Sequence, residues 1–289
     1  MVSLIPLMEV KSFLTGKRGV SLPFTDHCPP ICNSSADLEE MLNCIIEYGK
    51  TAGWKHIELR GDNEYFNAKP VSESFSMHFL DLSRSKEEIF AEFRDSTKRN
   101  IKRAGKENVD VELNNSRQSI EAFYRLNCET RRHHGLPPQP RYFFQKIFEQ
   151  IIAQDKGFVT LAYKQNRAIA GAVFFHFKDK AIYKYGASDR KYLDLRPNNL
   201  VMWKAIQWFA GNGFKSFSFG RTEPENNGLL QFKRGWGAKE QTLNYYRYDL
   251  IKDSFVSDQS GAKTSYSFFK ILPLPVLKFT GNILYRHVG

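Results

Sequence analysis

FSFGRTEPENNGLLQFKRGWG, residues 217–237, is the stretch that decides how this sequence is interpreted. An apolar run ends at Gly220, a polar loop follows, and a short apolar segment then leads to two closely spaced glycines. A strand end, a loop and a helix start in this order are where α/β proteins bind ligands. The residues that we expect to contact an anionic ligand there are Arg221, Phe232, Lys233, Arg234 and Trp236. Cations on loops are more often solvated, and Trp236 fits a core position equally well, so this stretch leaves both interpretations open.

The whole chain has 289 residues and is strongly basic. This length fits one or two domains with a full core, and a hydrophobic content of 42% is typical of an ordered globular protein. The formal net charge of +11 favours polyanionic partners, such as nucleic acid, nucleotide-linked substrates, coenzyme A or an acidic membrane surface. The charge does not choose among these partners.

The cysteines and the N-terminus indicate a protein of a reducing compartment. The chain has 4 cysteines, and Cys28 and Cys32 lack the spacing of a zinc-binding pair. We therefore expect reduced thiols, no metal site and a cytoplasmic location. Residues 1–7 lack the basic start of a secretory signal, and no uncharged run is long enough for a membrane-spanning helix.

Hydrophobic periodicity predicts the element order β-α-α-β-β-β-α-β-α-β over residues 108–250. The strands are expected at 109–113, 158–163, 168–177, 181–187, 215–219 and 243–250, and the helices at 119–132, 142–153, 199–212 and within 217–237. In residues 1–84 we expect a helix at 37–52 and strands at 54–60 and 74–82, which repeats the order at the end of the longer part. The sequence therefore predicts an α/β protein with two related halves, 1–84 and 108–250, joined by a connecting segment, 85–107.

The first half is predicted to be incomplete at its N-terminus. Compared with the second half, it lacks an opening strand, two helices and the next strand. The apolar segment 2–5 resembles a strand without neighbours, and an unpaired apolar edge is a liability. We therefore hypothesise that the chain begins late. Mass spectrometry of the native N-terminus tests this, and a native Met1 in a stable, active protein would contradict it.

The connecting segment is predicted to be one long helix that runs to about Gly105 and begins at a capping box formed by Ser85 and Glu88. Five cations are expected on one face of this helix, namely Lys98, Arg99, Lys102, Arg103 and Lys106. Like charges this close repel one another, so the arrangement favours a nearby anion, and a solvated basic face is the alternative.

The tail, residues 251–289, begins with polar residues and ends in an apolar segment that carries Lys270, Lys278 and Arg286. This combination is typical of a segment that seeks a membrane surface, so we expect peripheral membrane contact. The prolines of the tail argue against a regular amphipathic helix. A tail that packs back on the protein is the alternative.

Motifs along residues 1–250 resemble those of the FemAB-like proteins, a branch of the GNAT acyltransferase superfamily that pairs two GNAT-like halves. The most specific matches are FGRT at 219–222 and FKRGWG at 232–237. Further matches are PFTD at 23–26, TKRNIKRA at 97–104, RR at 131–132, GLPP at 135–138, YGAS at 185–188 and RPNNL at 196–200. The resemblance implies two halves in tandem, with mixed central sheets flanked by helices, and it also implies a missing start. RKYLDLRP at 190–197 replaces the glycine-containing turn that cradles pyrophosphate in ordinary GNAT enzymes, which argues against coenzyme A bound in the usual manner.

The resemblance implies an acyltransferase or aminoacyltransferase. The donor would be acyl-CoA or aminoacyl-tRNA, and the acceptor would be an amine of a peptidoglycan or polysaccharide precursor linked to a nucleotide or a lipid. In the family pattern Lys233 stabilises negative charge. Arg221 stands where it could grip a phosphate or carboxylate, and an ion pair with a nearby glutamate is the alternative. No serine or cysteine triad order is present in the sequence, so we expect direct attack by the amine.

Four further residues are expected near the reacting groups. Asp26 is expected as a base or an amine anchor, with an ordinary turn position as the alternative. The residues expected to orient the acceptor are Tyr185, Asn198 and Asn199, and either asparagine could instead cap a helix.

Two other classes of function remain open. A nucleic-acid-binding module would fit the charge, yet the sequence has no helix-turn-helix, zinc-finger or RNP pattern. A transfer-RNA donor would reconcile that class with a transferase. A non-catalytic scaffold in envelope or exopolysaccharide biosynthesis is the other class, and substitution of Lys233 or Arg221 would then have no biochemical effect.

Overall fold

The computed structural model describes residues 3–61, 64–66, 68–257 and 267–287. The strands are β1 (Met8–Ser12), β2 (Gly16–Val20), β3 (His56–Arg60), β4 (Glu73–Asp81), β5 (Asp110–Asn114), β6 (Gly157–Lys164), β7 (Arg167–Phe177), β8 (Lys180–Ser188), β9 (Ser216–Thr222), β10 (Lys239–Asp249) and β11 (Ser254–Val256). The α-helices are α1 (Ser35–Ala52), α2 (Lys86–Ala91), α3 (Asp95–Lys106), α4 (Arg117–His133), α5 (Arg141–Gln150), α6 (Pro197–Gly211), α7 (Asn227–Arg234) and α8 (Leu274–Leu284). Short 3₁₀ helices are η1 (Glu64–Phe66), η2 (Ile152–Gln154), η3 (Arg190–Leu195), η4 (Ser267–Lys270) and η5 (Tyr285–His287).

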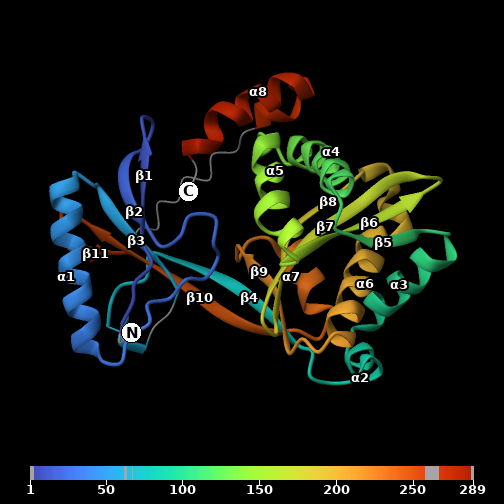
Figure 1. The fold of residues 1–289 in the computed structure, drawn as a ribbon, viewed down its shortest axis with the longest axis horizontal. Coiled ribbons are helices and arrows are strands. Elements are labelled where there is room, and N and C mark those ends of the chain that lie inside the picture. Colours follow the sequence, from blue (N-terminus) through green and yellow to red (C-terminus); the bar gives the residue numbers. More distant parts are fainter. Residues whose placement is uncertain (1–2, 62–63, 67, 258–266, 288–289) are drawn as a thin grey trace.

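The strands form one mixed sheet with helices on its faces, as Figure 1 shows. Their order across the sheet is β1-β2-β3-β10-β4-β9-β8-β7-β6-β5, and β11 pairs with β10. The α/β class with mixed strands flanked by helices is confirmed. The chain order from β5 to β10 is also the one predicted, β-α-α-β-β-β-α-β-α-β. The turn residues Gln165, Asn166 and Lys178, which have positive φ angles, join β6, β7 and β8 as consecutive hairpins.

The first half repeats part of the second half. The series β1-β2-α1-β3-β4 has the same order as β7-β8-α6-β9-β10, except that helix α7 stands between β9 and β10 where the first half has only the short η1. The pairing agrees as well, because β1–β2 and β7–β8 are antiparallel whereas β2–β3 and β8–β9 are parallel. The β1–β2 hairpin was not predicted. The segment expected as a strand near the start makes a single bridge between Leu4 and Ile31 in the described residues.

The two halves exchange strands at the centre of the sheet. β10 of the second half lies between β3 and β4, and β4 of the first half lies between β10 and β9. Phe79 on β4 pairs with Lys239 on β10, and Leu80 pairs with Phe217 on β9. Each half therefore completes the sheet of the other.

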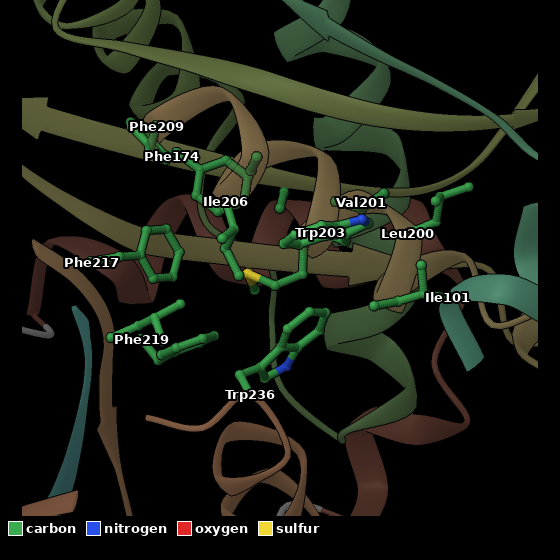
Figure 2. Packing of buried hydrophobic residues seen from close by; sticks show 14 of the residues in the cluster. Ile101, Phe174, Leu200, Val201, Trp203, Ile206, Phe209, Phe217, Phe219 and Trp236 are labelled. Atoms are coloured by element: carbon green, nitrogen blue, oxygen red, sulfur yellow. The ribbon is translucent and has the colours of Figure 1, made fainter. Parts of the chain in front are cut away.

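The second half has a core on each face of the sheet. Helices α4 and α5 cover one face, where Phe123 and Phe144 pack on alternate residues of β6 and β7. Helices α2, α3 and α6 cover the opposite face with the largest cluster. Figure 2 shows Trp236 pointing into this cluster below Trp203. A separate core under α1 holds the first half together.

Two predicted features of the helices were wrong. The long helix expected from Ser85 is two helices, because Phe93 turns into the core against Trp203 and Trp236 and thereby breaks the run. The predicted capping box of Ser85 and Glu88 is confirmed at the start of α2. The tail, expected to lack a regular helix, contains α8, where Pro275 stands in the first turn and costs no hydrogen bond. Among the described helices, none has the length and apolar character needed to cross a membrane.

Candidate active site between the two halves

A loop of the first half enters the second half where β8 and β9 separate. The register of these parallel strands runs from Lys180 opposite Ser216 to Ile182 opposite Ser218, and both strands continue beyond it. Gly220 on β9 has φ +69°, and a Cβ added there would lie 2.9 Å from Oδ2 of Asp26. The loop that carries Asp26 therefore approaches the β9 backbone so closely that only glycine fits without a shift.

Three strands hold this loop by its backbone carbonyls. Nζ of Lys184 on β8 donates to the carbonyl of Phe24 at 2.6 Å, and a guanidinium nitrogen of Arg60 on β3 donates to the carbonyl of Thr25 at 3.1 Å. The hydroxyl of Tyr245 on β10 donates to the carbonyl of Asp26 at 2.6 Å. Donors from both halves thus fix the position of the Asp26 side chain.

The Asp26 carboxylate lies between an ammonium group and a backbone N–H group. Its Oδ1 is 3.7 Å from Nζ of Lys184, and its Oδ2 accepts a hydrogen bond of 3.4 Å from the backbone N–H of Arg221. Burial lowers the pKa of Lys184, and the charge of Asp26 partly offsets this effect. An anion and a cation are therefore held side by side in a partly desolvated place, which is where charged groups act most strongly on a reacting molecule.

Lys233 lies behind β9 and is almost fully buried, with 1% of its surface exposed. It comes from α7, which the side chain of Asn226 caps. Its Nζ donates to the carbonyls of Gly220 at 2.8 Å and Arg221 at 3.0 Å. Burial lowers the pKa of Lys233 to about 8, and Asp26 partly offsets the shift. Lys233 thus fixes the strand end that faces Asp26 and adds positive charge there.

The guanidinium of Arg221 packs on aromatic rings. Its carbon lies 4.2 Å from the ring centroid of Phe75 and 5.2 Å from that of Tyr245. Such stacking leaves the edge of a guanidinium available for hydrogen bonds in its plane. The Arg221 side chain is therefore held against these rings, while its backbone N–H faces Asp26.

An apolar pocket of about 710 Å³ leads away from this cluster beneath α5. Its walls include Phe79, Ile147 and Phe175, and its polar lining includes Asp26 and Lys184. Tyr185 also lines the pocket, and burial raises the pKa of its phenol, which therefore stays a neutral hydrogen-bond donor. The pocket can take an elongated, mainly apolar group with its reactive end at Asp26.

The structure brings together four of the residues predicted for the site, namely Asp26, Tyr185, Arg221 and Lys233. Two other predicted residues lie away from this cluster. Trp236 is fully buried in the core beside Phe93. Arg234 is exposed and forms a pair of hydrogen bonds with Glu240. Phe232 packs against the same core as Trp236.

The predicted asparagines and basic helix face also lie outside the cluster. Helix α6 begins at Pro197 with Arg196 as its N-cap, so neither asparagine caps it. Nδ2 of Asn198 lies 3.4 Å from Oγ of Ser188, and Asn199 is buried. The five cations of α3 are Lys98, Arg99, Lys102, Arg103 and Lys106, and α3 belongs to the layer on the face of the sheet opposite α5. Lys98 donates to the carbonyl of Ala91 at 2.7 Å, so it joins α3 to α2.

Sequence reasoning missed the residues that hold the loop. Lys184 stands between two tyrosines inside a predicted strand, and a lysine in such a place indicates a buried polar partner. Arg60, at the end of a strand, and Tyr245, within one, gave no comparable signal, because both belong to ordinary alternating strands. Within the described part of the chain, no three His, Cys, Asp or Glu side chains are grouped closely enough to hold a metal ion.

Comparison with known proteins gives the kind of domain and the fold. Residues 91–234 match the family of acetyltransferase (GNAT) domains. A comparison with curated protein sequences gave no match. Among solved structures, FemX is similar at 14% sequence identity with a TM-score of 0.66, and the similarity covers 84% of each chain. L-PGS from Bacillus licheniformis is similar at 11% identity with a TM-score of 0.58, over 98% of this chain and 86% of that chain. These likenesses show a FemAB-like fold, and the family match identifies residues 91–234 as an acetyltransferase (GNAT) domain.

Proposed function

We propose that this protein transfers an acyl or aminoacyl group from an activated ester to an amine of a cell-envelope precursor. A transferase of the GNAT type is supported by the matched domain. The observation that carries the proposal is the position of Asp26, which the first half delivers beside Lys184 and the β9 strand end of the second half. The reaction would take place at the junction of the two halves.

The cluster suits attack of an amine on a carbonyl carbon. The amine nitrogen forms a bond to the carbonyl carbon, and its proton passes to the carboxylate of Asp26. The carbonyl oxygen then carries negative charge. We assign the stabilisation of this charge to the ammonium of Lys184, which lines the pocket and lies beside Asp26. When the bond to the leaving oxygen or sulfur breaks, the proton returns from Asp26 to the leaving group. Each such electrostatic contact contributes about 2.7–4 kcal/mol to catalysis.

Lys233 has a supporting part in this proposal. Its ammonium contacts the carbonyls of Gly220 and Arg221 and is almost fully buried, so it acts on the site through that strand end. The charge of Asp26 raises the pKa of Lys233 and so partly offsets the effect of burial on it. Lys233 is therefore proposed to position the site and to maintain its positive potential.

The donor is proposed to be aminoacyl-tRNA or acyl-CoA. The net charge of +11 and the basic face of α3 favour a nucleic-acid donor, which would need to reach around the sheet edge to present its ester. The chain passes through η3 before α6, where ordinary GNAT enzymes have their phosphate-binding turn. This arrangement supports aminoacyl-tRNA over coenzyme A.

The acceptor is proposed to be a nucleotide-linked or lipid-linked envelope precursor, used at the inner face of the membrane. FemX is a FemAB-like peptidoglycan aminoacyltransferase and L-PGS is a lysylphosphatidylglycerol synthetase, and both have this fold. The apolar pocket beside Asp26 supports an acceptor or donor with a long apolar part.

A ligand-induced thermal shift at low salt tests this proposal, with acetyl-CoA, a long-chain acyl-CoA, charged and uncharged tRNA, and a UDP-linked muropeptide as ligands. A ligand that binds the native state raises the melting temperature. Transfer is then measured with the ligands that bind. We expect Lys184→Met and Asp26→Asn each to lower kcat by about a hundredfold or more. Lys50→Met, which changes an exposed lysine of α1, is the matched control.

Other results would favour the other classes of function. Salt-dependent tRNA binding without transfer, unchanged in Lys184→Met, would indicate a nucleic-acid-binding protein. No shift with any ligand, in a chain that unfolds cooperatively, would favour a scaffold.

A further inference from the structure

Helix α8 has an apolar residue pattern on both sides. Leu277 is fully buried, and Gly281, one turn later, packs so closely on the carbonyl of Pro138 that a Cβ would not fit. The opposite side carries Val276, Phe279 and Ile283, which are 45%, 67% and 37% exposed. A helix that only packs on its own protein would have polar residues on this outer side.

The tip of the β1–β2 hairpin continues this exposed apolar side. Phe13 and Leu14 at the tip are 75% and 57% exposed. The ring of Phe13 lies 4.5 Å from that of His287, which stands one helical turn beyond Ile283. Figure 1 shows the hairpin and α8 rising at the same edge of the molecule. We refer to Phe13, Leu14, Val276, Phe279 and Ile283 as the tail–hairpin surface.

The surroundings of the tail–hairpin surface carry mainly positive charge. Residues 267–287 contain no aspartate or glutamate, and their cations are Lys270, Lys278 and Arg286. The hairpin adds Lys11 and Lys17, of which Lys11 pairs with Glu9. Exposed apolar side chains flanked by cations match the interface of an anionic bilayer, where the rings and aliphatic chains enter the headgroup region and the cations meet lipid phosphates.

We propose that the tail–hairpin surface docks this protein on the surface of a membrane that contains anionic phospholipids. With 11 residues, α8 is about 16 Å long, too short to span a hydrocarbon core of about 30 Å, so it lies along the surface. The hairpin tip provides a second anchor point beside it. Two separate elements entering the headgroup region fix the orientation of the protein, which one helix alone would not do.

Docking in this orientation gives the candidate active site a route to the membrane. A pocket of about 740 Å³ lies between the hairpin, α5 and the tail, and Met8, Tyr142 and Arg286 are among its lining residues. It shares Phe24 and Phe143 with the pocket that contains Asp26. The docking itself does not depend on the proposed function, whereas its use for a membrane-borne substrate does.

Vesicle co-sedimentation of the 289-residue chain tests the proposal. The vesicles consist of phosphatidylcholine alone, or of phosphatidylcholine with phosphatidylglycerol. We expect binding to the anionic vesicles, weakened at least about tenfold by the double change Phe279→Asp with Ile283→Asp, and also by Lys270→Glu with Arg286→Glu. Ile251→Asp changes an exposed apolar residue, 83% exposed, on the β10–β11 turn beside α1, and should bind as the unchanged protein does.

Three results would overturn the proposal. The first is no binding to anionic vesicles. The second is a loss of binding in Ile251→Asp equal to that in the tail variants. The third is a dimer in light scattering that Phe279→Asp dissociates, since a second copy would then cover the surface. The variants must keep the melting temperature of the unchanged protein for the comparison to count. Lys184→Met should bind vesicles normally, so failure of the proposed transfer activity would leave the docking result intact.

Discussion

Lys233 is an ammonium group in a place that disfavours its charge. Burial lowers its pKa to about 8, so the proportion of charged Lys233 falls as pH rises through this value. If the positive charge maintains the site, loss of that charge should lower kcat/KM above about pH 8. Deprotonation of the acceptor amine acts in the opposite direction and raises kcat/KM as pH increases. In Lys233→Arg, the decline should move to higher pH because an arginine stays charged.

The pH dependence of kcat/KM in the unchanged protein and in Lys233→Arg provides the measurement. Lys50→Arg, which changes an exposed lysine on α1, serves as the control and should leave the pH profile of kcat/KM unchanged. An identical declining limb in the unchanged protein and in Lys233→Arg would assign that limb to another group.

Sequence patterns could predict residues at the ends of elements better than residues within them. Asp26, Arg221 and Lys233 stand in or beside loops, where polar residues without a structural need are conspicuous. Lys184 lies inside β8. The alternation of polar and apolar residues along β8 does not reveal that its neighbour β9 diverges from it there. Trp236 lies in a loop of the same polar stretch, yet the packing of α2 against α6 makes it a core residue.

At the scale of elements, the close approach of β9 to the inserted loop predicts a specific effect of Gly220→Ala. The substitution places a Cβ 2.9 Å from the Asp26 carboxylate, at a backbone φ of +69°. We expect a loss of about 1–2 kcal/mol from the backbone conformation, and a further loss of turnover because Asp26 is displaced.

Gly213→Ala is the matched control for Gly220→Ala. Gly213 has φ +80°, and a Cβ added there meets no atom within 4 Å. The control should lower the melting temperature by a similar backbone effect and leave turnover unchanged. Equal turnover in the two variants would mean that Asp26 tolerates the shift or takes no part in the reaction.

The elements that were missed show where periodicity fails. β2 has the sequence Gly-Lys-Arg-Gly-Val, and its Arg18 is buried, with its guanidinium donating to Oγ1 of Thr15. A buried arginine and two glycines hide the alternation of the strand. The prolines of the tail disguised α8, since the rule against proline applies to helix interiors and Pro275 is in the first turn.

At the scale of the whole molecule, the strand exchange predicts that the second half does not fold alone. The division into 1–84 and 108–250 follows the predicted repeat of element order, but β10 has its partners β3 and β4 in the first half. We expect residues 108–250 to lack cooperative unfolding in circular dichroism, and residues 1–107 supplied in trans to restore it. Protected amides of β10 in the isolated fragment, measured by hydrogen exchange, would contradict this.

The interlocked sheet also sets the order in which a newly made chain can fold on the ribosome. Strand β4 is complete at Asp81, but its partners on β9 and β10 begin at Ser216 and Lys239. At a synthesis rate of about 5–20 residues per second, β4 emerges about ten to thirty seconds before the strand that covers its second edge. Both of its edges are open to other nascent chains until β9 emerges, and one edge stays open until β10 follows; closing contacts so distant in sequence is also slow in itself. Slower growth or a chaperone that shields β4 should therefore raise the yield of native protein more than any change to the active site.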